Sequence, residues 1–377
     1  MIAGKGGVTP GNHGNHQFSS PAPLPIMRTP TPFPEHDMRL NTLNELFTFN
    51  TWGHELVLSA AAPLSDAQLD QPFEMGPGSL RATLNHLYSA ERVWLDRWKH
   101  IDPPRPRPSA AGITVAQLQR ELPDVAAERR QFLERLTDTD LPQVQPIKNM
   151  KGEVTNCRLD DMLLHVCNHA IHHRAQAANM IKRGGGKPPS PGADYIFMRV
   201  ERISEPAPDL DLETIRAWLE YADWARARVA TIAAPLSNEQ LDRPFEIGPG
   251  SLRRALLHVT EAEQWWWGNW QGQPETFPDW PTTISMTELQ ARADELAAKR
   301  NRYLQSLNDA DLKHSVKVVP RPGRELEFPI GPSLLQICCH GTHHRAQAIN
   351  MLRHVGATVP TIDYITMRRE QSLAATS

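Results

Sequence analysis

The sequence is poor in cysteine: its 377 residues include only four, and no two of them are spaced as a CxxC pair. In a chain of this length, four scattered thiols do not make a disulfide framework. Free cysteines are typical of a reducing compartment, so we expect a cytoplasmic protein. The four are Cys157, Cys167, Cys338 and Cys339.

Positive charge is not in excess, and long apolar runs are missing. The 40 basic and 43 acidic residues give a formal net charge of -3, whereas proteins that bind nucleic acid or membrane surfaces carry a surplus of basic charge. No apolar run approaches the roughly 18–20 residues needed to cross a bilayer. The composition therefore argues against nucleic acid and membranes as partners.

The N-terminal segment lacks any pattern of regular structure. It is rich in Gly, Pro, Ser and Asn and shows neither a helical nor a strand period. Prolines interrupt each of its short apolar stretches, which is not the pattern of a secretory signal. We predict that residues 1–37 form a disordered tail.

What the sequence does contain is one unit repeated twice. LSDAQLDQPFEMGPGSLRATLNH, from Leu64, matches LSNEQLDRPFEIGPGSLRRALLH, from Leu236. HHRAQAANMIKR recurs as HHRAQAINMLRH, and ADYIFMR recurs as IDYITMR. The period of roughly 170 residues is the length of a domain rather than of a solenoid repeat. We expect copy one at residues 38–203 and copy two at 210–371, joined by a Pro-containing linker at 204–209.

Each copy is predicted to be mostly helical. Amphipathic segments open both copies, and a GPGS turn then places Ser79 or Ser251 as the N-cap of the second helix. The predicted helices span 41–60, 80–98, 115–136 and 159–183 in copy one, and 212–233, 252–270, 286–307 and 333–354 in copy two. Short extended pieces are expected at 144–155 and 316–328. The fold class is therefore all-α, with two tandem four-helix bundles.

Three histidines recur in both copies at a spacing that suits a metal ion. His169 and His173 are four residues apart on one predicted helix, so they share a face. His86 comes from a different helix, as in metal sites built between the helices of a bundle. Three imidazoles suit zinc, nickel, copper or iron better than magnesium or calcium, and they leave a position for water or substrate. The corresponding set in copy two is His258, His340 and His344.

Other polar residues near these histidines are not expected to be metal ligands. His172 and His343 lie about 100° around the helix from the neighbouring ligand, so we expect them outside the ligand set. His165 has Gln336 as its counterpart and is interpreted as a residue that either supports a ligand from outside the ligand set or is structural. Cys167 and Cys338 point to the opposite face and are expected to be buried thiols.

The remaining repeated side chains are interpreted as structural. Glu91 and Glu263 lie about 140° off the histidine face, so a salt bridge is favoured over a general-base role. We expect core or interface positions for Trp94, Trp98, Trp266 and Trp270. We also expect packing or hydrogen bonds within the bundle, rather than chemistry, for Arg174, Gln176, Arg345 and Gln347.

Two separated motifs carry a resemblance to a known family. NHAIHHRAQ at 168–176 and HGTHHRAQ at 340–347, together with NHLYSAERVWL and HVTEAEQWW upstream, resemble the DinB/YfiT-like family of metal-dependent proteins. The resemblance covers nearly everything after Met38. It implies a four-helix bundle with the three-histidine sites already described. Many members are homodimers, so the two bundles of this chain would form a pseudo-dimer within one chain.

The resemblance also implies a function. Some relatives are transferases or isomerases that use a low-molecular-weight thiol such as mycothiol or bacillithiol. A metal can hold such a thiol as the thiolate, which predicts a metal-dependent thiol transferase acting on a small-molecule substrate. Two alternatives stay open. One is a metal-dependent hydrolase, which is weakened because no general base is evident beside the histidines. The other is a stress-related metal-binding or scaffold protein without enzymatic activity.

Overall fold

The structure is a computed structural model. It describes residues 36–376 apart from 102–103, 107, 110, 149–153, 191, 275–276, 279 and 322. The predicted disordered tail, residues 1–37, therefore lies almost entirely outside the described residues. Among the described helices, none combines the length and the apolar character that a bilayer-spanning segment requires.

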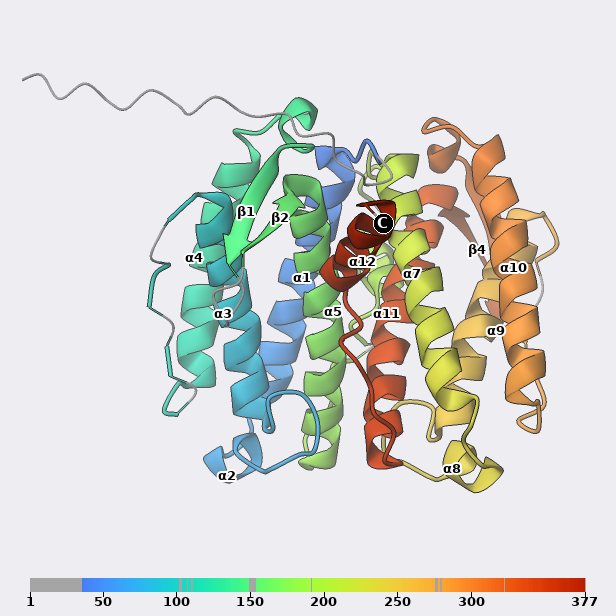
Figure 1. The fold of residues 1–377 in the computed structure, drawn as a ribbon, viewed down its shortest axis with the longest axis horizontal. Helices are drawn as coiled ribbons and strands as arrows, with labels where there is room; N and C mark the ends of the chain where they lie inside the picture. Colours follow the sequence, from blue (N-terminus) through green and yellow to red (C-terminus); the bar gives the residue numbers. More distant parts are fainter. Residues whose placement is uncertain are drawn as a thin grey trace, which may run out of the picture.

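The all-α prediction is confirmed. Copy one contains α1 (Leu40–Ala61), α2 (Asp66–Leu69), α3 (Leu80–Trp98), α4 (Val115–Leu133), β1 (Val144–Lys148), β2 (Val154–Arg158), α5 (Leu159–Arg183) and α6 (Tyr195–Glu201). Copy two contains α7 (Leu212–Ala233), α8 (Asn238–Asp242), α9 (Leu252–Trp270), α10 (Met286–Ser306), β3 (Ser315–Arg321), β4 (Arg324–Pro329), α11 (Ile330–His354) and α12 (Tyr364–Thr376). In each copy the four long helices form a bundle (Figure 1).

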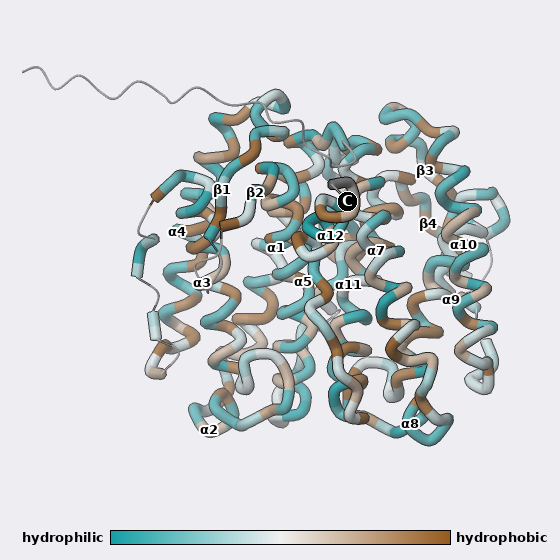
Figure 2. Tube along the Cα trace, viewed as in Figure 1, coloured by the Kyte–Doolittle hydropathy of each residue, from teal (hydrophilic) through white to brown (hydrophobic). Residues whose placement is uncertain are grey.

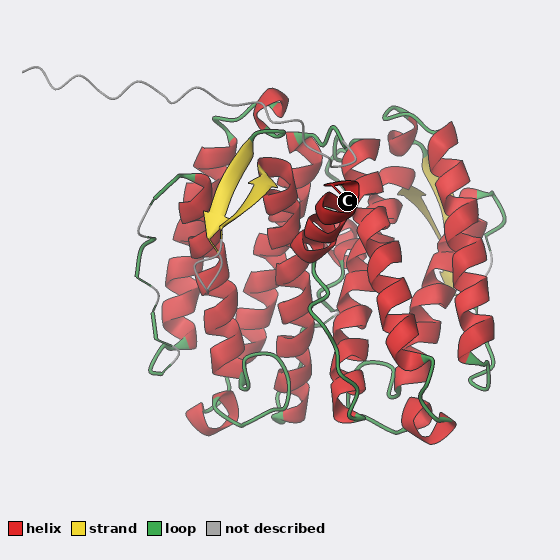
Figure 3. Cartoon of the chain, in the orientation of Figure 1, coloured by secondary structure: helices red, strands yellow, loops and turns green. Residues whose placement is uncertain are grey.

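The local signals explain where several elements begin. The hydroxyls of Ser79 and Ser251 accept from the backbone N–H of Ala82 and Arg254, as N-caps should. Hydrophobic and polar residues are interspersed along each long helix (Figure 2). Apolar residues three to four positions apart share one face of a helix, and that face can be buried. The expected extended pieces pair as two antiparallel hairpins, β1 with β2 and β3 with β4 (Figure 3).

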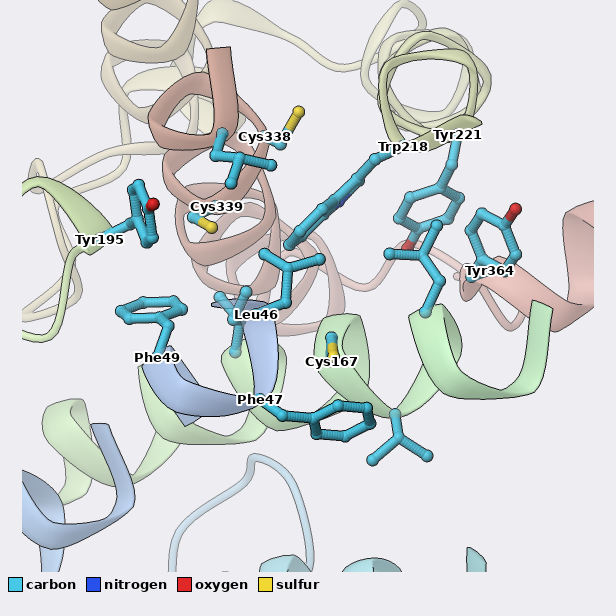
Figure 4. Close-up of a cluster of buried hydrophobic side chains, with 14 of the residues drawn as sticks. Leu46, Phe47, Phe49, Cys167, Tyr195, Trp218, Tyr221, Cys338, Cys339 and Tyr364 are labelled. Carbon is cyan, nitrogen blue, oxygen red and sulfur yellow. The ribbon is translucent and has the colours of Figure 1, made fainter. Parts of the chain in front are cut away.

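The two bundles share one apolar core. The histidine-bearing helices α5 and α11 pack against each other at the centre of the molecule (Figure 1). Around them, side chains of both copies meet in one cluster that includes Leu46, Phe49 and Trp218 (Figure 4). Cys167 and Cys338 are fully buried there, and all four cysteines are free thiols. This arrangement agrees with a pseudo-dimer within one chain.

The last helix of each copy crosses to the other copy. α6 packs on α11, and α12 packs on α5. Tyr195 and Tyr364, which begin these helices, are fully buried, and the hydroxyl of Tyr364 donates to Asp161 of copy one at 3.1 Å. The repeated ADYIFMR and IDYITMR motifs are therefore the segments by which each copy reaches the histidine helix of the other.

Candidate metal centre

The structure brings each predicted trio of histidines together. In copy one, His86 on α3 lies beside α5, and its Nε2 is 3.0 Å from Nε2 of His169. One ligand atom from each of His86, His169 and His173 lies within 4.8 Å of the other two. Nitrogens bound tetrahedrally to zinc are about 3.3 Å apart, so side chains at these distances can meet one ion.

Copy two repeats this geometry closely. Ring centroids in copy one are 4.9 Å apart for His86 and His169, and 4.4 Å apart for each of the other two pairs. The corresponding separations in copy two are 5.0, 4.6 and 4.4 Å. The duplicated sequence therefore produces duplicated clusters, the second made by His258, His340 and His344.

The donor set fits a divalent transition metal. Burial, followed by the charge of neighbouring histidines, holds the pKa of His344 well below its usual value, so the ring is neutral at pH 7. Neutral imidazole is the form that binds a metal. Nε2 of His340 is buried and has no hydrogen-bond partner, which is costly for a polar atom unless a ligand meets it. Each cluster contains three nitrogens and no carboxylate, which suits zinc, nickel or iron.

A glutamine orients one histidine of each cluster. Nδ1 of His173 lies 2.8 Å from Oε1 of Gln176, and Nδ1 of His344 lies 2.8 Å from Oε1 of Gln347. In the tautomer that donates from Nδ1, the lone pair of Nε2 is left for a metal. Gln176 and Gln347 make hydrogen bonds within the bundle, as predicted, and their partners are histidines at the cluster.

His172 and His343 stay outside the clusters, as predicted, and support the glutamines. Nε2 of His172 lies 3.1 Å from the amide nitrogen of Gln176, and Nε2 of His343 lies 3.0 Å from that of Gln347. The amide nitrogen donates here while the amide oxygen accepts from the other histidine. Both ends of each glutamine are therefore fixed.

The first glycine of each GPGS turn packs against the glutamine of its own copy. Gly76 and Gly248 have φ of 51° and 48°, a conformation that favours glycine. A Cβ at Gly76 would lie 2.5 Å from Oε1 of Gln176, and a Cβ at Gly248 would lie 1.9 Å from Oε1 of Gln347. The repeated turn is therefore needed for its close approach to the glutamine as well as for the N-cap that follows it.

A carboxylate of copy one reaches the cluster of copy two. Oδ2 of Asp194, at the start of α6, lies 3.3 Å from Nδ1 of His340. A carboxylate that accepts from one ring nitrogen fixes the imidazole and raises the basicity of the other nitrogen. Sequence reasoning missed this residue, although its recurrence in ADYIFMR and IDYITMR was a signal that could have drawn attention to it.

The neighbouring glutamates form salt bridges, as predicted. Glu91 pairs with Arg129 between α3 and α4, and both side chains are buried. Glu263 pairs with Arg300 in copy two, where Asp223 provides Arg300 with a second carboxylate. Because these carboxylates are bound to guanidinium groups, they are poorly suited to act as a general base.

The other predicted neighbours have structural positions. His165 is buried, and its ring centroid lies 5.8 Å from that of His169 and 5.0 Å from that of Trp94. It lies outside the group of three ligand atoms. The four tryptophans that we expected in the core or at an interface are buried: Trp94, Trp98, Trp266 and Trp270.

The comparison with protein families agrees with the fold and with the repeat. The family model described as "DinB family" matches the chain twice, at residues 38–202 and 212–373. No curated protein and no solved structure gives a significant match. The two matches cover most of the chain and divide it at the same place as the internal repeat. The chain therefore belongs to the DinB family, and it contains two tandem copies of the family's domain.

Proposed function

We propose that each histidine cluster binds one divalent transition metal ion, zinc first among the candidates, and that the protein transfers a low-molecular-weight thiol to an electrophilic small molecule. The ligands would be His86, His169 and His173 in copy one, and His258, His340 and His344 in copy two. The observation that carries this proposal is the composition of the clusters. Each offers three nitrogens, and among the described residues no fourth His, Cys, Asp or Glu joins them, which leaves room for a substrate.

Thiol transfer suits this site better than hydrolysis does. A bound divalent ion lowers the pKa of a thiol that meets it, so that the thiolate predominates at neutral pH. A nucleophile formed in this way needs no further general base. Metal-assisted hydrolysis profits from a carboxylate or histidine free to move protons, whereas Glu91 and Glu263 are paired with arginines.

The side chains of the protein would hold the metal and orient its ligands rather than react with the substrate. Gln176 and Gln347 fix one histidine ring in each cluster, and Asp194 fixes His340. In the transfer, the thiol proton goes to solvent and the sulfur forms a bond to the electrophilic carbon. The leaving group departs with the electron pair of its own bond. Free buried cysteines in the chain fit a reducing compartment such as the cytoplasm.

The first test is the metal content of protein purified without a histidine tag. We expect about two equivalents per chain in the parent, about one in each of His173→Ala and His344→Ala, and none in the double variant, because a trio that loses one of its three ligands binds far more weakly. A parent protein that binds no metal after reconstitution would overturn the proposal at its base.

The second test is turnover by the metal-loaded protein. We expect 1-chloro-2,4-dinitrobenzene to be conjugated to at least one of bacillithiol, mycothiol, glutathione or cysteine, and the double variant to be inactive. Ester hydrolysis without added thiol would instead support a hydrolase. Two bound metal ions with no turnover of any thiol or ester would support a metal-binding or scaffold protein.

A further inference from the structure

A cavity of about 300 Å³ lies between the two copies and extends to the histidine cluster of copy two. This volume is at the lower end of the range of small-molecule sites. Copy one contributes residues at the start of α6, and copy two contributes α9, α11 and the loop after α9. The lining includes Asp194, Phe197, Trp265, Trp266, Phe277 and His340.

Aromatic rings form a continuous wall from the histidine cluster into the cavity. The ring of Phe277 lies 5.7 Å from that of His258 and 6.1 Å from that of Trp265. Trp265 in turn meets Trp266 at 4.8 Å in an edge-to-face arrangement. Phe277 is 37% exposed, so part of this wall is open to solvent. A flat apolar molecule seated here would have one end beside the proposed metal.

The carboxylates of the lining are held by partners. Glu263 is paired with Arg300, and Asp194 lies 3.3 Å from Nδ1 of His340, beside the proposed divalent ion. Apolar and aromatic side chains make up most of the rest of the lining. The lining therefore favours an aromatic molecule by its shape rather than by its charge.

The same region of copy one is built from different residues. Trp265 corresponds to Val93, and Phe197 corresponds to Thr366. The face of Trp94, the counterpart of Trp266, carries the guanidinium of Arg97 at 4.6 Å from the ring centroid. Fewer aromatic side chains and a nearby cation make this region unlike the cavity of copy two, although the histidine geometry is the same.

We propose that the cavity between α6, α9 and α11 binds the aromatic part of a substrate at the copy-two centre. This inference rests on the proposed function for the substrate's role as an electrophile. Binding of the aromatic part can be measured without turnover, because residues of the chain alone form the cavity. The proposal also assigns a specificity-determining role to Phe197, which copy one contributes to the site of copy two.

Binding can be measured by calorimetry on the full-length, metal-loaded protein with the neutral probe 1-naphthalenemethanol. A probe without a carboxylate is needed, because a carboxylate is itself a ligand for the metal. We expect one equivalent of the neutral probe to bind. No binding of the neutral probe would overturn the proposal.

Two variants that copy the residues of copy one locate the site. Trp265→Val and Phe197→Thr should each weaken the neutral probe about tenfold, because each removes an aromatic contact. Val93→Ala, at the counterpart of Trp265 in copy one, is the matched control and should leave binding unchanged. Phe197 is only partly buried, so Phe197→Thr still tests the cavity if Trp265→Val fails to fold.

Metal content measured in the same samples separates this inference from the proposed function. Two equivalents of metal together with variant-sensitive binding of the neutral probe would support both. Two equivalents of metal with no binding of the neutral probe, or with binding that neither variant weakens, would overturn the cavity proposal and leave the metal proposal standing. Variant-sensitive binding of the neutral probe to a protein that binds no metal would support the cavity proposal and overturn the metal proposal.

Discussion

The histidine clusters of copy one and copy two have almost the same ring separations, whereas the aspartates that reach toward them from the opposite copy make different contacts. Asp194 lies 3.3 Å from Nδ1 of His340. Its counterpart Asp363 instead accepts from the backbone N–H of Thr366 at 2.7 Å and caps α12. No hydrogen bond joins Asp363 to His169 within the part of the chain that is described.

Different contacts at the starts of α6 and α12 accompany this difference. Oε1 of Gln336 accepts from the backbone N–H of Ile196 at 2.8 Å and so satisfies a free donor at the start of α6. The backbone N–H of Phe197, the counterpart of Thr366, donates to the backbone oxygen of Asp194 at 3.1 Å, and the Asp194 side chain makes no cap, so this carboxylate is available to His340. Copy one has His165 at the position of Gln336, and the side chain of Asp363 caps α12. A duplicated ligand set can therefore keep its geometry while the residues that support it diverge.

The largest expected effect comes from the buried ion pairs, which differ between the copies. Glu91 is 2% exposed, so Arg129→Met would leave its charge buried and unpaired at a cost of about 3–5 kcal/mol of unfolding free energy. In copy two, the side chains of Glu263 and Asp223 are 15% and 26% exposed. We expect Arg300→Met to cost less, as measured by chemical denaturation.

The control for this comparison is the double variant Glu91→Gln, Arg129→Met, which removes both charges. It should recover a large part of the lost stability, because the cost lies mainly in the unpaired carboxylate. Equal losses in Arg129→Met and Arg300→Met would show that burial of the carboxylates does not distinguish the two copies.

The next effect concerns the two GPGS turns. Gly248→Ala would place a Cβ 1.9 Å from Gln347 at a positive φ, so both backbone strain and displacement of the glutamine contribute, about 2–3 kcal/mol in all. Gly76→Ala has more room, at 2.5 Å, and should cost less. Gly112→Ala is a control, since it has a positive φ with no atom within 4 Å of the added Cβ. An equal loss in all three variants would mean that only backbone conformation matters.

Asp194→Asn tests the aspartate comparison directly. Removing a carboxylate that orients a metal-binding histidine lowers metal affinity about 10–100-fold, and we expect this loss only at the copy-two cluster. Asp363→Asn should leave copy-one affinity unchanged, because that residue caps a helix. Chelator competition can follow each site separately in backgrounds carrying His173→Ala or His344→Ala. A loss at copy one with Asp363→Asn would break the proposed asymmetry.

Much of this arrangement could be predicted from the sequence. The i, i+4 histidines and the repeated third histidine indicate a shared site, because helical periodicity puts His169 and His173 on one face. The long helices, the N-cap serines and the salt-bridged Glu91 follow from equally local rules. The exact boundaries of the copies, 38–203 and 210–371, stay a prediction.

The missed crossing of α6 and α12 depends on contacts between distant segments. α6 and α12 are only 7 and 13 residues long, and nothing in their composition indicates that each crosses to the other copy. The contact between Asp194 and His340 follows from that crossing, since 146 residues separate the two. Gln176 is three residues from His173, and its role could have been inferred from helical spacing.

The smallest effect concerns the segment that leads into copy one. His36 contacts Glu220 of α7 at 2.9 Å and Glu213 at 3.4 Å, whereas the counterpart of His36 before copy two is Pro208, which cannot make such a pair. Burial lowers the pKa of His36, but the hydrogen bonds with Glu220 and Glu213 outweigh it and leave the pKa raised above 6.5. The stabilisation is therefore complete below the unfolded-state value and is lost as the pH rises through the folded-state pKa.

We expect this stabilisation to stay below about 1 kcal/mol, because the glutamates are partly exposed. Unfolding free energies of the parent and of His36→Gln should differ most at pH 5.5 and converge toward pH 8.5. His314→Gln is a suitable control, since His314 is highly exposed and its ion-pair neighbour among the described residues, Asp311 at 3.5 Å, belongs to the same copy. A parent–variant difference that stays constant across this pH range would mean that His36 stabilises by packing alone, and the contrast with Pro208 would then be one of shape rather than of charge.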